Sequence, residues 1–536
     1  MAAMFYGYLS DYLSGTQLNL FARVTALSSI LLLSACSAES HDDNNKVANN
    51  HAENSNNTEL SSAEIKSPPV SASELKPGGD TTTSIQPFPA FDKVAENLPD
   101  DLKADFFAGK ALAEQPWVKA PTITTARDGL GPLYNARACL ACHIRGGKGR
   151  LPDDSNSAVF NAFLRLSIPA ESPDDIDPRI GVIPEPVYGE QLQGQSIALH
   201  HQLRASDPQQ IHAKGDVSPE AYVYVNWHSK TITYADGSQT EIRWPEADIR
   251  YLSYGPLHEN TQISLRNAPA IHGMGLIEAI PQQAIDRLAD PDDSNQDGIS
   301  GRVNRVWDAV SGKTVPGRFG LKANRPNMDM VVASAFANDI GISNPLFPSQ
   351  PCTAAQAVCN QQIHGTSNNE FELPAELLAL VTEFSRNLAV PERRDANDPE
   401  VLNGRDLFYQ SGCHLCHQPS FITRDSTAGT SQNNTHLLNQ TIWPYSDFLL
   451  HDMGDGLADK RPDFLATGNE WRTPPLWGTG LSQRVNGSNS FLHDGRARSV
   501  EEAILWHGGE ASGALQNFLQ MDKSSRMALI RFVESL

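Results

Sequence analysis

Basic residues are scarce in this sequence. Its 42 Lys and Arg stand against 63 Asp and Glu, which gives a formal net charge of −21. A protein that binds nucleic acid needs a basic surface to face the phosphates, so this balance argues against that class of function. Long apolar runs are also scarce, and the mean hydropathy of −0.38 excludes a multi-span membrane protein. The sequence shows no Ser/His/Asp pattern and no glycine-rich loop of the phosphate-binding kind.

Cysteine is scarce as well, with seven residues in a chain of 536. That number is too small for a protein held together by a disulfide framework. The rest of the composition fits a folded globular protein, because 40% of the residues are hydrophobic and 20% are charged. The length suggests two to four domains. The positions of the cysteines are therefore more informative than their number.

The N-terminal region is typical of an exported lipoprotein. An apolar run over residues 24–35 follows Arg23; it is too short to span a bilayer and has the size of a signal-peptide core. It ends at Cys36, in a context similar to the site where bacterial lipoproteins are cleaved and where the cysteine thiol receives a diacylglycerol. A buried apolar helix is the alternative, but the Asn- and Ser-rich residues that follow offer it no packing partner.

We therefore predict a lipoprotein signal peptide over residues 1–36 and a disordered polar linker over 37–85. The protein would then lie in the cell envelope, at the outer membrane and facing the periplasm, with membrane contact only through a lipid anchor at Cys36. Because that compartment is oxidising, Cys352 and Cys359 are expected to form a structural disulfide rather than a redox centre.

Four further cysteines lie in two C-x-x-C-H motifs. This is the attachment signature of c-type haem, in which both thiols bond to one porphyrin and the following histidine ligates the iron. A zinc site would need further paired ligands, and a redox dithiol would not need a histidine after both motifs. The sequence therefore predicts two covalently bound haems c, attached at Cys139 and Cys142 and at Cys413 and Cys416, with His143 and His417 as iron ligands.

The surroundings of the two motifs form an internal repeat. Residues 269–276, downstream of the first motif, parallel residues 474–481 downstream of the second, and each half ends in an amphipathic helical pattern. We therefore expect a mainly α fold of two cytochrome-c-like domains, 86–392 and 393–536, the second beginning with a helix at Pro399. The first domain is enlarged by a β-containing insertion, with a β-like run over 221–227 and a hairpin over 231–244.

Several motifs resemble those of known dihaem proteins. The R-T-P-P and H-D-G-R motifs at 472–475 and 493–496 are similar to those of the dihaem cytochrome c peroxidases and of the dihaem enzyme that matures tryptophylquinone cofactors. From about residue 90 onward the chain resembles the bacterial di-haem oxidoreductases, often labelled thiol oxidoreductases, through motifs at 275–281, 317–320, 450–454 and 491–497. One departure is Leu321, where the family often has tryptophan, and this weakens an electron relay at that position.

The resemblance implies a second iron ligand for the C-terminal haem. In the peroxidases this ligand lies fourteen residues after the histidine of the H-D-G motif, a spacing that leads here from His493 to His507. We therefore expect His417 and His507 on either side of the iron, and a lower reduction potential than methionine ligation would give. Met453 and His451 are the alternatives.

For the N-terminal haem, no H-D-G motif follows from which the position of the second ligand could be counted. Its second ligand is one of His258, His272 and Met274, or the position is open to substrate. An open position suits peroxide chemistry, which needs an acid/base group beside the iron. Glu278 is the candidate for that catalytic role, and a structural hydrogen-bonding role is the alternative.

A loop between these regions has the pattern of a calcium site. Asp293, Asn295 and Asp297 offer oxygen atoms at alternate positions before Gly298. Asn304 stands where an EF-hand has its bidentate glutamate, so a solvated turn is the alternative.

Together these features predict an exported dihaem c-type cytochrome that acts as an oxidoreductase. Electrons would pass through the C-terminal haem to a substrate-facing N-terminal haem, and the resemblance implies peroxide as the substrate. The expected partners are small redox proteins or a small-molecule oxidant or reductant, and not nucleic acid. A non-catalytic dihaem electron carrier and an accessory lipoprotein in iron or haem handling are the alternatives.

Overall fold

The computed structural model describes residues 66–85, 91–123, 126–197, 217–362, 371–426 and 432–536. All of these belong to one compact unit that extends from Ser62 to Leu536. The predicted signal peptide, Cys36 and residues 37–65 of the predicted linker lie outside the described residues. No helix in the described ranges is long and apolar enough to cross a membrane.

The prediction of a mainly α fold is wrong. Helices make up 30% of the chain and strands 18%. The cytochrome-like helices account for only part of the residues, and the long segments between them form short antiparallel strand pairs and loops. The described strands pair into six two-stranded sheets. These are β1 (Leu133–Tyr134) with β3 (Gln195–Ser196), β2 (Ala162–Ser167) with β6 (Gln262–Asn267), β4 (Tyr222–Thr233) with β5 (Gln239–Arg250), β7 (Arg305–Asp308) with β8 (Lys313–Pro316), β9 (Phe421–Ile422) with β10 (Thr441–Ile442), and β11 (Leu450–Asp452) with β12 (Glu470–Arg472).

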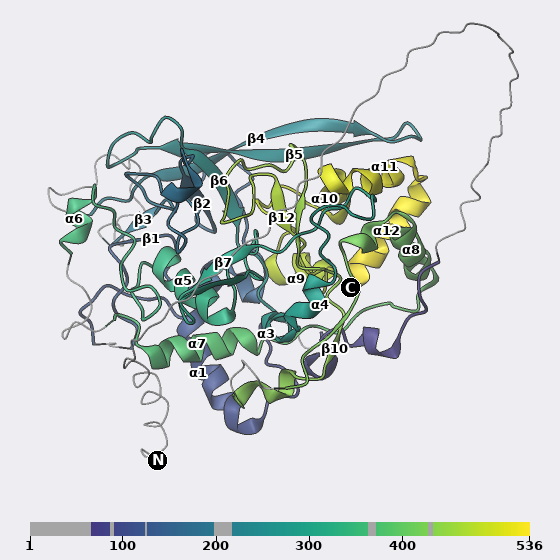
Figure 1. Cartoon of the computed structure of the whole chain (residues 1–536), viewed down its shortest axis with the longest axis horizontal. Coiled ribbons are helices and arrows are strands. Elements are labelled where there is room, and N and C mark those ends of the chain that lie inside the picture. Colours follow the sequence, from purple (N-terminus) through teal and green to yellow (C-terminus); the bar gives the residue numbers. More distant parts are fainter. Residues whose placement is uncertain (1–65, 86–90, 124–125, 198–216, 363–370, 427–431) are drawn as a thin grey trace, which may run out of the picture. The chain divides into compact units, whose positions relative to one another are not determined.

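Two pairs of helices organise the two halves of the chain. In the first half α1 (Lys103–Glu114) packs on α7 (Ala375–Arg386), and in the second half α8 (Pro399–Gln410) packs on α12 (Lys523–Ser535) (Figure 1). The other helices in the described ranges are α2 (Cys139–Cys142), α3 (Met274–Ala279), α4 (Gln282–Asp286), α5 (Met328–Asp339), α6 (Ala357–Asn360), α9 (Ser482–Asn486), α10 (Val500–Leu505) and α11 (Ser512–Gln520).

The two helix pairs cross in the same way. A Cβ atom on Gly109 of α1 would lie 2.0 Å from the carbonyl oxygen of Leu380 in α7. A Cβ atom on Gly404 of α8 would lie 1.8 Å from the carbonyl oxygen of Ala528 in α12. Glycine at these two positions therefore lets the helix backbones come into contact.

Each helix pair is the centre of a hydrophobic core. Phe106 and Phe384 belong to the first core, and Phe408 and Phe532 belong to the second. A third core lies between the strand pairs of the first half, where β2, β4 and β6 contribute alternate residues such as Leu164. The predicted helix start at Pro399 is confirmed, because the side chain of Asp398 accepts a hydrogen bond from the backbone N–H of Glu400 at 2.8 Å.

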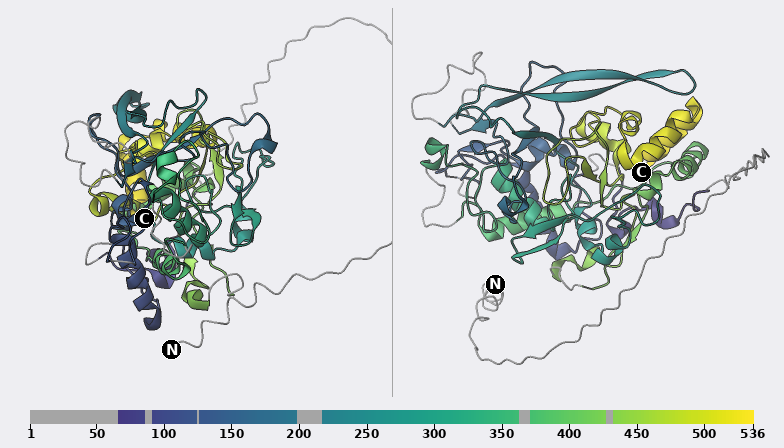
Figure 2. Two further views of the ribbon diagram at one scale, coloured as in Figure 1. Left: turned by 90° about the vertical axis from the view of Figure 1, so that its left-hand side faces the viewer. Right: turned by 45° about the horizontal axis from the view of Figure 1, so that its top comes forward.

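The longest strands, β4 and β5, form a single hairpin. The sequence predicted separate runs over 221–227 and 231–244, but the ladder is continuous from the Tyr222–Arg250 pair to the Thr233–Gln239 pair. The hairpin reaches over the C-terminal helices in Figure 1 and in the right-hand view of Figure 2. At its tip the backbone N–H of Ala235 donates to the carbonyl of Leu519 in α11 at 3.0 Å. A segment from the first half therefore covers part of the second half.

Residues 66–85, which the sequence assigned to the disordered linker, are folded. They include the 3-10 helices Ala72–Leu75 and Gly79–Thr81. The backbone N–H of Thr83 donates to the carbonyl of Val390 at 2.9 Å, and that of Trp443 donates to the carbonyl of Pro77 at 2.8 Å. We call residues 66–85 the N-terminal strap. A few specific polar contacts, and not an apolar face, hold the strap in place. Its composition is therefore as polar as that of a linker.

Candidate functional site

The first C-x-x-C-H motif is formed by helix α2 and the residue after it. Cys139 and Cys142 are free thiols. The Nδ1 atom of His143 donates a hydrogen bond to the carbonyl of Pro269 at 2.7 Å. This contact orients the ring and fixes its tautomer, so that the other nitrogen, Nε2, carries the lone pair that an iron ligand needs.

The second motif repeats this arrangement. Cys413 and Cys416 are free thiols, and Cys413 begins the 3-10 helix Cys413–Leu415. The Nδ1 atom of His417 donates to the carbonyl of Tyr445 at 2.8 Å. Burial lowers the pKa of His417 to about 4, so the ring is neutral and able to ligate a metal.

The structure brings His507 into the environment of His417. His507 follows helix α10 and donates from Nδ1 to the carbonyl of Ala503 at 2.7 Å, which leaves Nε2 for a ligand. The charge that His507 carries when protonated lowers the pKa of His417 further, so the two rings interact electrostatically. Two neutral imidazoles with their Nδ1 atoms occupied are what a bis-histidine haem requires.

The two alternative ligands of the second haem are placed differently. Both ring nitrogens of His451 contact carboxylates, with Nδ1 2.6 Å from Glu510 and Nε2 2.8 Å from Asp447. Burial alone would lower the pKa of His451, but the hydrogen bonds to Asp447, to the Cys416 thiol and to Glu510 outweigh it and raise the pKa to about 12. A doubly bonded imidazolium has no lone pair for iron. Met453 packs against the second core.

The three residues considered for the first haem are not equivalent either. His258 is exposed, and its Nδ1 accepts a hydrogen bond from the backbone N–H of Asn260. Met274 is buried in the first core. His272 is buried, stacks on Phe91 with ring centroids 4.1 Å apart, and has an Nδ1 atom with no hydrogen-bond partner among the described residues. Its Nε2 atom donates to the carbonyl of Trp477 at 3.2 Å.

Buried polar atoms without partners gather beside the first motif. The side chains of Asn486 and Ser488 have nitrogen or oxygen atoms without a hydrogen-bond partner among the described residues. A Cβ atom on Gly147 of the motif loop would lie 2.0 Å from the Oδ1 atom of Asn486, so the side chain of Asn486 adjoins the loop. Lys148 of the same loop lies 4.8 Å from the centre of the Phe491 ring, and burial lowers its pKa to about 8. These donors, together with the free thiols and the oriented histidines, fit a bound group that carries carboxylates, as haem does.

The H-D-G motif lies in a buried, charged region that joins the two halves. His493 stacks on Trp471 with ring centroids 3.8 Å apart and an interplanar angle of 9°. The Nζ atom of Lys322 lies 4.2 Å from the centre of the Trp471 ring, and the Lys322 side chain is wholly buried. Three cations pair with two carboxylates in a cluster whose side chains are at most 9% exposed: Arg266, Lys322, Asp459, Arg461 and Asp463.

Glu278, the predicted acid/base residue, is held by two partners. Its Oε1 atom accepts from the backbone N–H of Met328 at 2.8 Å, and its Oε2 atom accepts from Nε of Arg386 at 2.6 Å. Arg386 also pairs with Asp329 and Glu383. These contacts join α3, α5 and α7 and are those of a structural ion pair; the catalytic role stays a prediction.

The predicted calcium loop closes on itself. The carboxylate of Asp293 accepts from the backbone N–H of Gly298 at 3.2 Å, and the side chain of Asn295 donates to Asp297 at 3.0 Å. The side chains of Asn295 and Asp297 are exposed. This is the hydrogen bonding of a solvated turn, and calcium binding stays a prediction. The disulfide between Cys352 and Cys359 is formed, as predicted.

One carboxylate near the first motif has no signal in the sequence. Asp339 ends helix α5, and burial raises its pKa. Burial and the Asp339 carboxylate together raise the pKa of Cys139 and of Cys142 to about 12. Because Asp339 lies almost two hundred residues from the motif along the chain, only the tertiary structure brings it there.

Comparison with known proteins gives a family match. Residues 72–536 match the model of a family described as di-haem oxidoreductase, putative peroxidase. Neither the curated proteins nor the solved structures gave a significant match. The family match covers both C-x-x-C-H motifs, His507 and most of the N-terminal strap.

Proposed function

This chain belongs to the di-haem oxidoreductase family, and on that premise we propose that it is a lipid-anchored dihaem c-type cytochrome of the cell envelope that reduces peroxide. Electrons enter at the half that carries His417 and His507 and reach the substrate at the half that carries His143. The electron donor is a small redox protein or a small-molecule reductant. Bound to these residues, each haem supplies a one-electron Fe(III)/Fe(II) couple.

The observation that carries the proposal is the matching geometry of the two motifs. Each has two free thiols, and each histidine donates its Nδ1 hydrogen to a backbone carbonyl, Pro269 in one half and Tyr445 in the other. A backbone carbonyl can only accept, so both rings keep Nε2 free for iron. A zinc site or a redox dithiol would not need this orientation twice.

The asymmetry between the halves supports a substrate-facing first haem. His507 supplies a second imidazole near His417. In the first half, the carbonyl of Pro269 bonds to His143, and the backbone N–H of Ile271 donates to the carbonyl of Gly146 at 2.9 Å. The segment that leads to His272 therefore follows the His143 side of the motif, and in our proposal peroxide reaches the first haem from the opposite side.

Attachment is tested by replacing the cysteines in pairs. Cys139→Ala with Cys142→Ala, and separately Cys413→Ala with Cys416→Ala, should each halve the haem content measured after acid–acetone extraction. Cys352→Ala with Cys359→Ala is the matched control, because it removes two cysteines of the disulfide and should retain both haems. A matured protein without covalently retained haem would refute the proposal.

The reaction is tested by the ferric and half-reduced spectra with and without peroxide. A high-spin component that peroxide converts would indicate an open iron, as the proposal requires. If the haems are low-spin in every redox state, the peroxidase proposal is wrong. Electron transfer would then be the function that remains.

A further inference from the structure

We propose that Glu74 of the N-terminal strap is a positioning residue for the C-terminal haem. It fixes Tyr445, and the carbonyl of Tyr445 in turn holds the iron ligand His417. The inference rests on the proposed function, since it concerns how strongly His417 binds iron. It assigns a role to a segment that lies before both haem motifs in the sequence.

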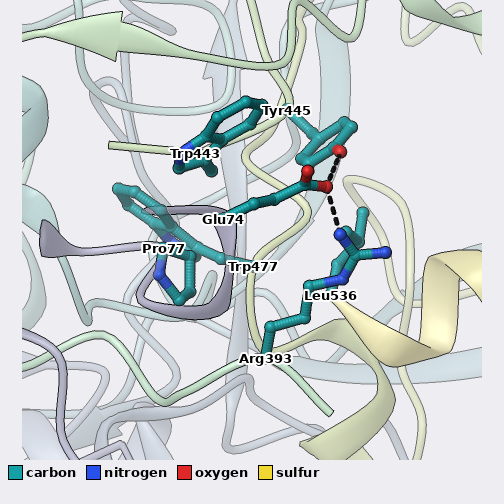
Figure 3. A pocket seen from close by; sticks show the side chains of 7 residues that line it. All are labelled: Glu74, Pro77, Arg393, Trp443, Tyr445, Trp477 and Leu536. Atoms are coloured by element: carbon teal, nitrogen blue, oxygen red, sulfur yellow. Dashed lines mark hydrogen bonds and ion pairs between the residues drawn. The ribbon is translucent and has the colours of Figure 1, made fainter. Parts of the chain in front are cut away.

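Glu74 is a buried carboxylate with three charged or polar partners. It is 0% exposed, although it lies on the 3-10 helix Ala72–Leu75 in a segment of polar composition. Its Oε1 atom accepts from the hydroxyl of Tyr445 and from the guanidinium of Arg393 (Figure 3). Its Oε2 atom accepts from Arg405 at 2.7 Å. A buried carboxylate with this many donors is tightly fixed.

Tyr445 needs such an anchor because of its backbone. Its φ angle is +53°, in the left-handed region that is strained for a residue other than glycine. The ring is wholly buried and packs edge-on against Phe408 and Phe532, with centroids 6.0 and 5.8 Å away. The packing holds the ring, and the bond from the hydroxyl to Glu74 fixes its outer end. Together they set the direction of the carbonyl group.

That carbonyl is the partner of His417. It accepts the Nδ1 hydrogen of His417 at 2.8 Å. A strong hydrogen bond from Nδ1 makes the imidazole a stronger donor to iron, which favours the ferric state. If the carbonyl shifts, the hydrogen bond weakens, the ferric state loses that support, and the reduction potential of this haem rises.

The other contacts of the strap keep it in place without involving Tyr445. The indole N–H of Trp443 donates to the hydroxyl of Ser73 at 3.1 Å, and the hydroxyl of Thr83 donates to Glu96 at 2.7 Å. Loss of one of these contacts would loosen the strap, as loss of a Glu74 contact would, but without removing a contact of Tyr445 or His417. A variant at Thr83 therefore separates a specific effect on His417 from a general loss of order.

The experiment measures the midpoint potentials and the ferric EPR g-values of both haems in the full chain. The C-terminal haem is identified as the one that His507→Ala converts to high spin. Glu74→Gln keeps the shape of the side chain but leaves Arg393 and Arg405 without their counter-charge, so it tests the anchor at some risk to folding. Tyr445→Phe removes only the hydroxyl and preserves both ion pairs. Thr83→Val, of similar shape, is the matched control.

We expect Glu74→Gln and Tyr445→Phe to raise the midpoint potential and change the g-values of the C-terminal haem alone. The N-terminal haem and the Thr83→Val protein should behave as the wild type. Unchanged values in a folded Tyr445→Phe protein, or equal shifts in both haems or in Thr83→Val, would overturn the inference. A wild-type protein without two covalent haems would instead refute the proposed function, so the two failures are distinguishable.

Discussion

At the level of single residues, the three histidines predicted to bind iron share one hydrogen-bonding arrangement. His143, His417 and His507 each donate Nδ1 to a main-chain carbonyl, at 2.7, 2.8 and 2.7 Å. His451 shows the contrast, because carboxylates on both ring nitrogens keep it protonated. The C-x-x-C-H spacing predicted the first two ligands, and the family resemblance predicted His507. The partners of the rings could not be predicted, since Pro269 and Tyr445 are brought near by the fold alone.

Removal of His507 should change the spin state of one haem. In His507→Ala we expect one low-spin ferric haem to become high-spin, because the iron loses its sixth strong-field ligand, while both haems stay covalently attached. The electronic absorption and EPR spectra measure this change. His258→Ala is the control, since His258 is exposed and should leave the spectra unchanged. An unchanged spectrum in His507→Ala would show that another residue binds the iron.

His493 should make the stability depend on pH in acid. Burial lowers its pKa to about 4, against 6.5 for the free side chain. The unfolded state therefore binds a proton before the folded state does, and the free energy of unfolding falls as the pH drops from about 6.5 to about 4. The loss from this residue is about 3 kcal/mol by linkage.

Denaturant titrations at several pH values test that expectation. His493→Phe retains a ring that can stack on Trp471 and removes the titrating group, so its unfolding free energy should decline less than that of the wild type over this range. Parallel curves for the two proteins would contradict the assignment.

At the level of elements, the two helix pairs carry the resemblance between the halves. The helix-start signal at Pro399 places α8 correctly, because it acts within the first turn of the helix. The hairpin was predicted in two pieces, since the alternation of its side chains is interrupted by the polar residues at 228–230. The contacts of the strap had no local signal, because buried single residues such as Glu74 leave no periodic pattern.

Gly404 should be indispensable to the α8–α12 crossing. A methyl group there would lie 1.8 Å from the carbonyl oxygen of Ala528, so Gly404→Ala must separate the helices and should destabilise the protein by about 2 kcal/mol or more. Gly513→Ala in α11 is the matched control, because no atom lies within 4 Å of the added group. It should be neutral or slightly stabilising, since alanine is the better helix former. Equal effects in thermal unfolding would refute the close contact.

At the level of the whole molecule, the hairpin and the strap connect the two halves. The hydroxyl of Tyr234 at the hairpin tip donates to Glu501 at 2.7 Å, and Arg526 pairs with Asp236 at 3.0 Å. The ring centroids of Trp244 in the hairpin and Trp506 are 6.0 Å apart, and Trp506 precedes His507 in the sequence. These contacts explain why residues 62–536 form one compact unit and not two separate cytochromes.

Shortening the hairpin should uncouple the halves. If residues 228–244 are replaced by an Asn-Gly turn, Trp506 and Phe518 lose their cover, and we expect the C-terminal half to unfold at a lower guanidinium concentration than the first half. Soret ellipticity and tryptophan fluorescence would then show two transitions where the wild type shows one. Replacing the turn at 309–312 between β7 and β8 is the control, because Gly312 there has no neighbouring atoms within 4 Å of an added Cβ. A single transition in the shortened protein would contradict the coupling.

The sequence alone predicted haem attachment and proximal ligation, because both depend on a motif of five consecutive residues that occurs twice. It also determined the helices that begin at local signals and the disulfide at Cys352 and Cys359. Only the tertiary structure decided the balance of helix and strand, the carbonyl partners of the histidines, and the placement of Glu74 and Asp339. These depend on contacts between residues far apart in the chain, and such contacts follow from packing and buried charge, which no short segment encodes.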